Sequence, residues 1–183
     1  VLDMRMDDNL KNDGAFVLNN YNHQNLSRIF RDYADFKNPN SIVDAIIQSR
    51  SKKSINTTFE LKDIFTNKVS SHNENKFFAR LFQAIRIEVN DEIGALKALL
   101  TQCLDVLKPS GRLVIISYHS VEDRIVKSFM KFGNFSSNPN KDFFGNRLQP
   151  FHVITKKPIT PSISEIKSNN KSRSAKLRIC EKA

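Results

Sequence analysis

Glycine is scarce in this chain, with only five among its 183 residues. The G-x-G-x-x-G and P-loop motifs need glycines at fixed positions so that the backbone can approach phosphates, and neither motif occurs. The sequence also has no C-x-x-C pair, no H-E-x-x-H and no G-x-S-x-G. These absences argue against a glycine-rich phosphate loop, a zinc-protease helix and a hydrolase nucleophile elbow within this stretch.

Cysteine and long apolar runs are also rare. Cys103 and Cys180 are too few for a disulfide scaffold or a zinc site, and this usage fits a reducing cytoplasm. No run of about 18 apolar residues exists, so we expect no membrane-spanning segment. His119 has no other histidine at a helpful spacing, and we predict no metal site. The expected setting is cytoplasmic, without membrane contact.

Acidic residues are outnumbered by basic ones, 19 Asp and Glu against 29 Lys and Arg, which gives a formal net charge of +10. This excess favours a polyanionic partner, with nucleic acid as the leading candidate. A general basic bias of the source is the alternative. The length suffices for one domain, or for one domain with a small insertion.

The stretch from Lys108 to Arg124 organises the prediction. A Pro-Gly turn precedes Leu113–Ile116, an apolar run typical of a strand buried on both faces. Ser120 with Asp123 then fits a capped helix start. Ligands in open α/β sheets bind beyond the carboxyl ends of strands, so this corner is a candidate site. Its polar residues are His119, Ser120, Asp123 and Arg124.

Three short amphipathic helices are expected before this strand. Their periods cover residues 21–36 and 41–50, and a third begins at a capping box of Thr57 with Glu60. Together they predict a helical subdomain over residues 21–76, whose basic side would face an RNA backbone. A solvated surface is the alternative for any single lysine.

Two longer helices, 77–90 and 93–107, lead into the central strand. This alternation of helix and strand is typical of α/β folds with a parallel sheet. A long loop is expected over 133–150. The remaining elements are a strand at 151–155, a short helix capped by Ser162 with Glu165, and a terminal strand at 174–180.

The terminal strand alternates in polarity. Leu177 and Ile179 fall on one face, and Lys176 and Arg178 fall on the other. This pattern predicts a half-exposed strand that is antiparallel to its neighbour.

Five segments carry a family resemblance: Leu2–Asp7, Phe82–Asn90, Ile115–Arg124, Lys156–Ser162 and Arg173–Arg178. In residues, order and spacing they resemble the bacterial 16S ribosomal RNA cytosine-N4 methyltransferases. Each motif alone is modest, but the likeness covers essentially the whole chain.

The resemblance implies a class I methyltransferase core, with a Rossmann-like sheet and an inserted helical subdomain. Residues 1–20 would be a loop of that core, residues 21–76 the insertion that recognises RNA, and residues 77–183 the C-terminal part of the core. The implied reaction transfers a methyl group from S-adenosyl-L-methionine to the exocyclic amine of one cytidine in the decoding region. The implied partner is 16S rRNA in the small ribosomal subunit.

One departure from the family is large. Its glycine-rich cofactor loop, ribose-binding acid and motif beside the target amine precede the segment that matches Leu2–Asp7, and none occurs in these 183 residues. We therefore expect a C-terminal fragment that is inactive alone. S-adenosyl-L-methionine would be bound mainly by an N-terminal portion, and no cofactor-binding residue is assigned here.

The implied chemistry is direct displacement, in which the cytosine amine attacks the sulfonium methyl group. Asn90, His119 and Asp123 are the candidates for orienting the target base, although His119 also suits a hydrogen-bonded corner. The candidates for contacting RNA are Arg5, Arg86, Ser120, Arg124, Arg173 and Arg178. For the arginines, internal pairing with Asp3, Asp7, Glu88 or Asp123 is the alternative.

Two rival hypotheses stay open. A basic helical module with an incomplete sheet would bind rRNA without a methyl donor. A small-molecule methyltransferase would carry its positive charge incidentally and would show no salt-dependent affinity for rRNA. Calorimetry with S-adenosyl-L-methionine tests the first rival, because we predict weak or no binding by the fragment and binding by the complete gene product.

Overall fold

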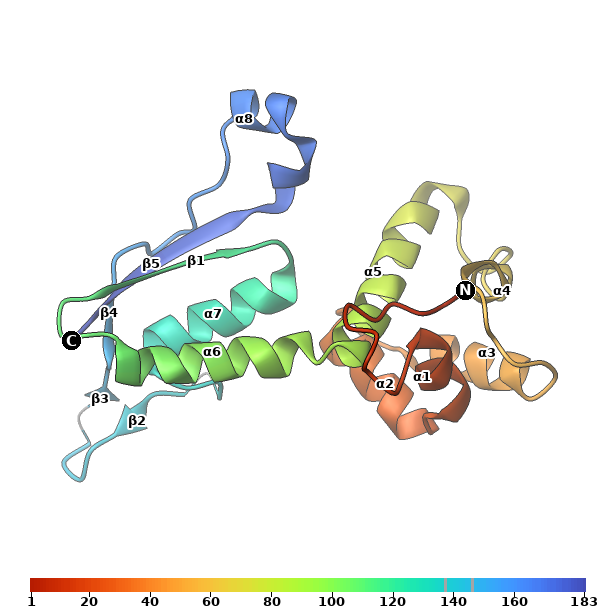
Figure 1. The fold of residues 1–183 in the computed structure, drawn as a ribbon, viewed down its shortest axis with the longest axis horizontal. Coiled ribbons are helices and arrows are strands. Elements are labelled where there is room, and N and C mark those ends of the chain that lie inside the picture. Colours follow the sequence, from red (N-terminus) through yellow and green to blue (C-terminus); the bar gives the residue numbers. More distant parts are fainter. Residues whose placement is uncertain (137, 146) are drawn as a thin grey trace. The chain divides into compact units, whose positions relative to one another are not determined.

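The computed structural model describes residues 1–136, 138–145 and 147–183 (Figure 1). Its contacts divide the chain into two compact units, Val1–Glu92 and Ile93–Ala183, which we call the N-terminal and the C-terminal unit. Each unit has its own hydrophobic core. Among the described residues, no helix combines the length and apolarity needed to cross a bilayer.

The N-terminal unit is helical. Its elements are α1 (Gly14–Asn20), α2 (His23–Asp32), α3 (Asn40–Arg50), α4 (Thr58–Asp63) and α5 (Ser71–Val89). Phe30 of α2, Ile46 of α3 and Leu81 of α5 are fully buried and belong to one cluster. Each helix turns one side into this shared core, and in α2, α3 and α5 the inward apolar residues recur at helical spacing.

Side-chain caps fix several helix starts in this unit. Thr57 accepts a hydrogen bond from the Glu60 backbone N–H, and the Glu60 carboxylate accepts from the Thr57 backbone N–H. This reciprocal capping box confirms the predicted start of α4. Asn22 caps α2 and Asp13 caps α1 in the same manner, each through one side-chain oxygen.

The chain before α1 is built into the N-terminal unit. Leu2 is fully buried, and its backbone oxygen accepts from the Ala15 N–H at 2.8 Å. The Asp3 backbone oxygen accepts from the Gly14 N–H at 2.6 Å. A Cβ at Gly14 would lie 3.0 Å from the Leu2 oxygen, so glycine permits this close approach.

The C-terminal unit combines helices with a small sheet. Its elements begin with α6 (Glu92–Val106), whose first residue lies at the unit boundary, and continue with β1 (Arg112–Ser117), α7 (Ser120–Phe132), β2 (Asn140–Lys141), β3 (Arg147–Leu148), β4 (Phe151–Val153), α8 (Ile163–Ser168), the 3-10 helix η1 (Asn170–Ser174) and β5 (Lys176–Lys182). β2 and β3 form a separate two-stranded ladder.

Three strands make the main sheet, in the order β1-β5-β4 (Figure 1). β5 is antiparallel to both neighbours, which confirms the prediction for the terminal strand. Ile115 pairs with Arg178 and Ser117 pairs with Lys176 across β1 and β5. The chain is therefore a mixed α/β protein, although the described strands form no parallel pair.

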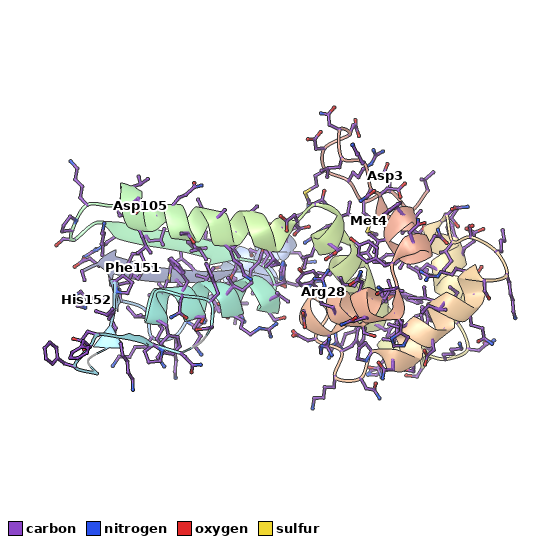
Figure 2. The ribbon with its side chains drawn as sticks, turned by 90° about the horizontal axis from the view of Figure 1, so that it is seen from below. Asp3, Met4, Arg28, Asp105, Phe151 and His152 are labelled. Carbon is purple, nitrogen blue, oxygen red and sulfur yellow. The ribbon has the colours of Figure 1, made fainter. Side chains whose placement is uncertain are left out.

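Only one face of the main sheet is well covered within this unit. Phe151 of β4 and Cys180 of β5 pack with Phe129 of α7 and Leu100 of α6. Figure 2 labels Phe151, which is enclosed, and His152, the next residue, which is exposed. Alternate strand positions thus point to opposite faces.

The opposite face corrects a prediction. Val114 and Ile116 of β1 are both 53% exposed, so β1 is not buried on both faces as its apolar run indicates. α7 packs against β1, β4 and β5, and Val114 and Ile116 lie on the face away from its core. We call the face formed by Val114, Ile116, Leu177 and Ile179 the open face.

Other element predictions were wrong in detail. His119 rather than Ser120 caps α7, with Glu122 rather than Asp123 as its acidic partner. α5 begins at Ser71, six residues before the expected start at residue 77, and α1 was missed. The predicted loop 133–150 holds the ladder of β2 and β3, and two of its residues, 137 and 146, lie outside the described residues.

The two units do not follow the boundaries predicted from the family. The N-terminal unit contains α5, because its Leu81 and Ile85 join the same core as α1 to α3. A compact structural unit need not coincide with a segment that was inserted during evolution. The assignment of residues 1–20, 21–76 and 77–183 to a methyltransferase core and its insertion stays a prediction.

Candidate functional site

The candidate site lies in the C-terminal unit, where β1 ends and α7 begins. Ser117 is the last residue of β1, and α7 starts three residues later. The antiparallel partner β5 begins opposite this point, since Ser117 pairs with Lys176. The corner therefore joins the end of β1, the first turn of α7 and the segment η1–β5.

His119 and Glu122 form the start of α7. The His119 Nδ1 accepts from the Glu122 backbone N–H at 3.3 Å. The Glu122 carboxylate accepts from the backbone N–H groups of Tyr118, at 2.9 Å, and His119, at 3.3 Å. A histidine thus performs the capping that serine or threonine usually performs. The exchange fixes the backbone of the corner.

The other ring nitrogen of His119 has no such role. Nε2 is buried and makes no hydrogen bond within the described part of the chain. It lies 3.3 Å from Glu122 Oε1, which is ion-pair distance without hydrogen-bond alignment. Because Nδ1 accepts, the proton of a neutral ring resides on Nε2. The Nε2–H of a neutral His119 ring is therefore a buried hydrogen-bond donor without an acceptor among the described residues.

Asp123 joins α7 to β5 through a buried ion pair. Its two carboxylate oxygens accept from Arg178 Nε at 2.7 Å and Arg178 Nη2 at 3.1 Å. Lys176 Nζ lies 3.4 Å from the same carboxylate. A bidentate pair of this kind holds both side chains in fixed orientations. Arg178 faces inward, which corrects the face assigned to β5.

Burial and charge act in opposite directions on the two acids. For Asp123, burial alone would raise the pKa, but the hydrogen bonds and charge of Arg178, with Lys176, outweigh it and lower the pKa. For Glu122, burial also opposes ionisation, and contacts with the His119 ring and the Tyr118 backbone N–H lower the pKa. Both carboxylates are therefore anionic at neutral pH.

A cavity of about 310 Å³ opens beside this corner. It is lined by Tyr118, Asn170, Lys171, Arg173 and Ser174. Tyr118 is 56% exposed, so its ring presents an aromatic surface. Arg173 Nη1 contacts only Asn170 Oδ1, at 3.5 Å, among the described residues. An aromatic surface beside two cations is the combination that binds unpaired bases and their phosphates.

The remaining candidates at this corner are Ser120 and Arg124. Both are exposed residues in the first turns of α7. They share that turn with His119 and Asp123, so the structure brings together the four polar residues that the sequence placed at the corner. Arg173 and Arg178 join them from η1 and β5.

The other three candidates lie in the N-terminal unit and have structural partners there. Arg5 donates to Asp3 through Nε at 2.7 Å and Nη2 at 3.0 Å. Arg86 makes the same bidentate contact with Glu92, at 2.7 and 3.0 Å. These pairs favour the ion-pair alternative for both arginines.

Asn90 at the end of α5 binds backbone. Its Oδ1 accepts from the Met6 N–H at 2.7 Å, and its Nδ2 donates to the oxygens of Met4 and Arg86, each at 2.8 Å. Met4 has φ +67°, an unfavourable conformation for a residue with a Cβ. Asn90 therefore holds a strained segment, in which Figure 2 labels Asp3 and Met4.

Lys171 and Lys176 were not predicted as site residues, whereas Tyr118 was expected only as part of the segment from Tyr118 to Arg124 that lines or supports the cleft. Tyr118 lies in the quoted motif, directly after the strand, which is a signal that favours a site position. Lys176 and Arg178 share one face of β5, and the sequence contains no local sign that this face meets Asp123. Long-range pairing alone reveals that contact.

Comparison with known proteins identifies the family. A model described as the MraW methylase family matches residues 1–183, and the chain belongs to this family. It is 50% identical to a protein of Flavobacterium psychrophilum, over 99% of this chain and 62% of that protein. It is 49% identical to one of Amoebophilus asiaticus, over 99% of this chain and 58% of that protein.

A third relative comes from Karelsulcia muelleri, with 46% identity over 100% of this chain and 60% of that protein. All three relatives carry the name ribosomal RNA small subunit methyltransferase H. The chain spans about three fifths of the length of these relatives. The predicted family resemblance is confirmed.

Proposed function

We propose that this chain is part of an enzyme that methylates the N4 amine of one cytidine in the decoding region of 16S rRNA. The observation that carries the proposal is the family match over residues 1–183, with relatives named as ribosomal RNA small subunit methyltransferases. The cytidine, its N4 position and the decoding region rest on the five sequence motifs. The partner is then the small ribosomal subunit, in the cytoplasm.

We also propose that the main sheet is the C-terminal part of a larger Rossmann-like sheet. β1 lies at the edge of the order β1-β5-β4, so one side of its backbone has no strand partner among the described residues. Val114 and Ile116 leave its open face apolar and exposed. Further strands beside β1 and a layer over this face would satisfy both features.

The described sites do not fit the methyl donor, S-adenosyl-L-methionine. Its sulfonium is cationic, whereas the site cavity carries Lys171 and Arg173 and no acid lines it. A cation in that cavity would meet like charge. We therefore place donor binding outside this chain, in an N-terminal portion of the longer protein. In this proposal the described residues contact the RNA and hold the RNA-contacting side chains in position.

In this proposal the corner holds RNA. The Tyr118 ring stacks on a base, and Lys171 and Arg173 contact phosphates. His119 is a positioning residue, because its ring caps α7 and so fixes the backbone beside Tyr118. Asp123 is a positioning residue, because it acts through Arg178.

Three other predicted residues enter the proposal with these roles. Ser120 and Arg124 flank the RNA from the first turns of α7. Asn90 is a third positioning residue, since it holds the segment from Met4 to Met6. Unpaired RNA is favoured over duplex, because stacking on Tyr118 requires an exposed base face.

Methyl transfer tests the proposal. The longer protein that contains this chain is incubated with labelled S-adenosyl-L-methionine and small subunits from cells that lack the protein. We expect label in 16S rRNA, and mass spectrometry should locate one N4-methylcytidine in the decoding region. Absence of label, or label at another base, would contradict the proposal.

A second measurement separates the enzyme from a non-catalytic RNA-binding fragment. Calorimetry should detect S-adenosyl-L-methionine binding by the longer protein and weak or no binding by residues 1–183. His119→Ala should lower methyl transfer more than it lowers the melting temperature. Unchanged turnover in that variant would remove His119 from the site.

A further inference from the structure

A second cavity lies in the C-terminal unit and shares Arg178 with the corner of β1 and α7, but not Tyr118, Lys171 or Arg173. Its volume is about 340 Å³, at the small end of the range for ligand pockets. Met130 of α7 and Val153 of β4 provide apolar lining. Cationic side chains from three segments complete it: Lys127 and Lys131 from α7, Lys156 after β4, and Arg178 from β5.

The charge of this cavity is largely uncompensated. No acidic residue lines it. Lys127 and Lys156 make no ion pair or hydrogen bond within the described ranges, and both are exposed. Lys131 Nζ lies 4.8 Å from the Phe132 ring centroid, a contact that leaves its charge in place. Three lysines therefore surround an apolar floor without a neutralising partner.

Arg178 adds a directed donor. Its Nε and Nη2 are committed to Asp123, which fixes the plane of the guanidinium group. Its Nη1 makes no hydrogen bond with any described residue, and Arg178 lines the cavity. The ion pair with Asp123 thus also fixes the orientation of the arginine that lines the second cavity.

We propose that this cavity binds one nucleotide of single-stranded RNA, at a place separate from the Tyr118 corner. The base would lie against Met130 and Val153, and its flanking phosphates would contact Lys127 and Lys156. Cations from separate segments, α7 and the chain after β4, suit a chain that carries a phosphate on each side of every nucleoside. The inference rests on the proposed function for the identity of the polyanion as RNA.

Single-stranded RNA fits better than duplex or acidic peptide. A duplex keeps its bases stacked and presents phosphates to a surface, whereas this cavity offers an apolar floor for an extruded base. A peptide carboxylate would meet the lysines but would supply no planar ring for Met130 and Val153. A nucleotide of single-stranded RNA uses both the apolar floor, which contacts its base, and the lysines, which contact its phosphates.

The test measures binding of a short fluorescent single-stranded oligoribonucleotide to the longer protein that contains this chain. Lys127→Glu with Lys156→Glu should weaken binding by about tenfold or more and reduce the salt slope by about one to one and a half. Lys108→Glu with Lys167→Glu is the matched control, because both lysines are exposed and outside the cavity. The control should lose less than about threefold.

A third variant tests the cavity without changing charge. Val153→Trp should fill the floor and weaken single-strand binding several-fold, while binding of a duplex of the same sequence stays unchanged. Equal losses in the cavity pair and the control pair would overturn the inference. So would unchanged binding by Val153→Trp, or displacement of the probe by polyglutamate as readily as by unlabelled RNA.

The same preparations separate this inference from the proposed function. The cavity pair should raise the KM for small subunits and leave kcat within about twofold, since these lysines contact the RNA at a distance from the reacting base. If the unaltered protein transfers no methyl group, the proposed function fails. If the unaltered protein transfers the methyl group and the cavity pair has the same KM and the same RNA affinity, only the inference fails. If the cavity pair lowers the melting temperature but leaves RNA binding unchanged, another part of the protein occupies the cavity, and the inference also fails.

Discussion

The two units differ in how completely they enclose their apolar residues. The N-terminal unit surrounds Phe30, Ile46 and Leu81 with five helices and the segment that contains Leu2. The C-terminal unit has a smaller buried cluster on one side of its sheet and leaves Val114 and Ile116 half exposed. The unit with the open face also contains both candidate RNA sites. We therefore expect the stability of the C-terminal unit to depend less on a closed core and more on polar contacts such as the Asp123–Arg178 pair.

The ion pairs of the two units differ in burial, and even the Arg28–Glu88 pair of the N-terminal unit leaves the arginine side chain 39% exposed. In the N-terminal unit, Arg5 with Asp3 and Lys53 with Glu60 lie at the surface. In the C-terminal unit, Asp123 and Arg178 are both buried and join elements 55 residues apart. Surface pairs contribute little to stability, whereas breaking a buried pair leaves a charge without a partner. The comparison therefore predicts different sensitive positions in each unit.

Removal of a buried ring should cause the largest loss. Phe30→Ala in the N-terminal unit should lower the free energy of unfolding by about 3–5 kcal/mol, because it leaves a cavity in a closed core. Urea denaturation followed by circular dichroism measures the change. Phe59→Ala is the control, since Phe59 is 76% exposed, and it should cost about 0.5 kcal/mol or less. Equal losses would contradict the description of the core.

The buried ion pair should come next. Asp123→Ala should lower the free energy of unfolding by about 3 kcal/mol, since Arg178 then stays buried without a counter-charge. Asp123→Ala with Arg178→Met should recover part of that loss. Asp44→Ala, which removes an exposed partner of His23, should change stability by less than about 1 kcal/mol. A double variant less stable than the single one would refute this account.

Asn90 should contribute an intermediate amount. Asn90→Ala removes three hydrogen bonds to backbone and should cost about 1–3 kcal/mol, because the half-buried oxygens of Met4 and Arg86 and the exposed Met6 N–H lose a partner. Hydrogen exchange at the Met6 amide should become faster. Asn20→Ala provides the comparison, since its side chain bonds only within α1 at the surface. Unaltered exchange at Met6 would show that Asn90 does not hold this segment.

The open face should tolerate a charge. Val114→Lys should change the unfolding free energy of residues 1–183 by about 0.5 kcal/mol or less, because the side chain already meets solvent. The same change in the longer protein should be strongly destabilising if further layers cover this face. Melting temperatures of the two polypeptides provide the measurement. A large loss in residues 1–183 alone would mean that Val114 is buried.

Acid titration should show the smallest effect. The Arg5 guanidinium lowers the pKa of Asp3 to about 2, and Lys53 lowers that of Glu60 to about 2, both at exposed positions. The pKa of Asp123 is also lowered, but at a buried pair. High salt should therefore move the pKa values of Asp3 and Glu60 toward their ordinary range and change that of Asp123 less. Carboxyl NMR chemical shifts measure all three.

The sign of the stability change follows from the same shift. A lowered carboxyl pKa stabilises the fold at pH values above the unfolded pKa. For Asp123 that contribution is present above about pH 4 and disappears as pH falls through the lower folded value. Asp123→Asn should flatten the acid limb of a stability profile. A profile identical to that of the unaltered protein would contradict the pairing.

Local sequence signals predicted helix starts well. The capping boxes of Thr57 with Glu60 and the cap of Ser162 on Glu165 appear as expected. The start of α7 was predicted one residue late, because histidine is not a usual cap. α1 was missed, since its seven residues are too short for a helical period to be visible. These outcomes depend on interactions within one or two helical turns.

The candidate site was predictable in part. The motif that follows β1 indicated His119, Ser120, Asp123 and Arg124 from the turn and strand pattern. Arg173 and Arg178 came from the family resemblance. The roles of Tyr118 and Lys171 required the structure, because η1 reaches the end of β1 only after β5 has paired with it.

The sequence by itself determined the family, the order of most helices and strands, and the excess of positive charge, because each depends on residue identity or short-range spacing. The tertiary structure decided which face of each strand is covered and which charges are neutralised. Arg178 shows the reason: an alternating strand looks the same whichever face is buried, and only the approach of Asp123 from α7 turns the arginine inward.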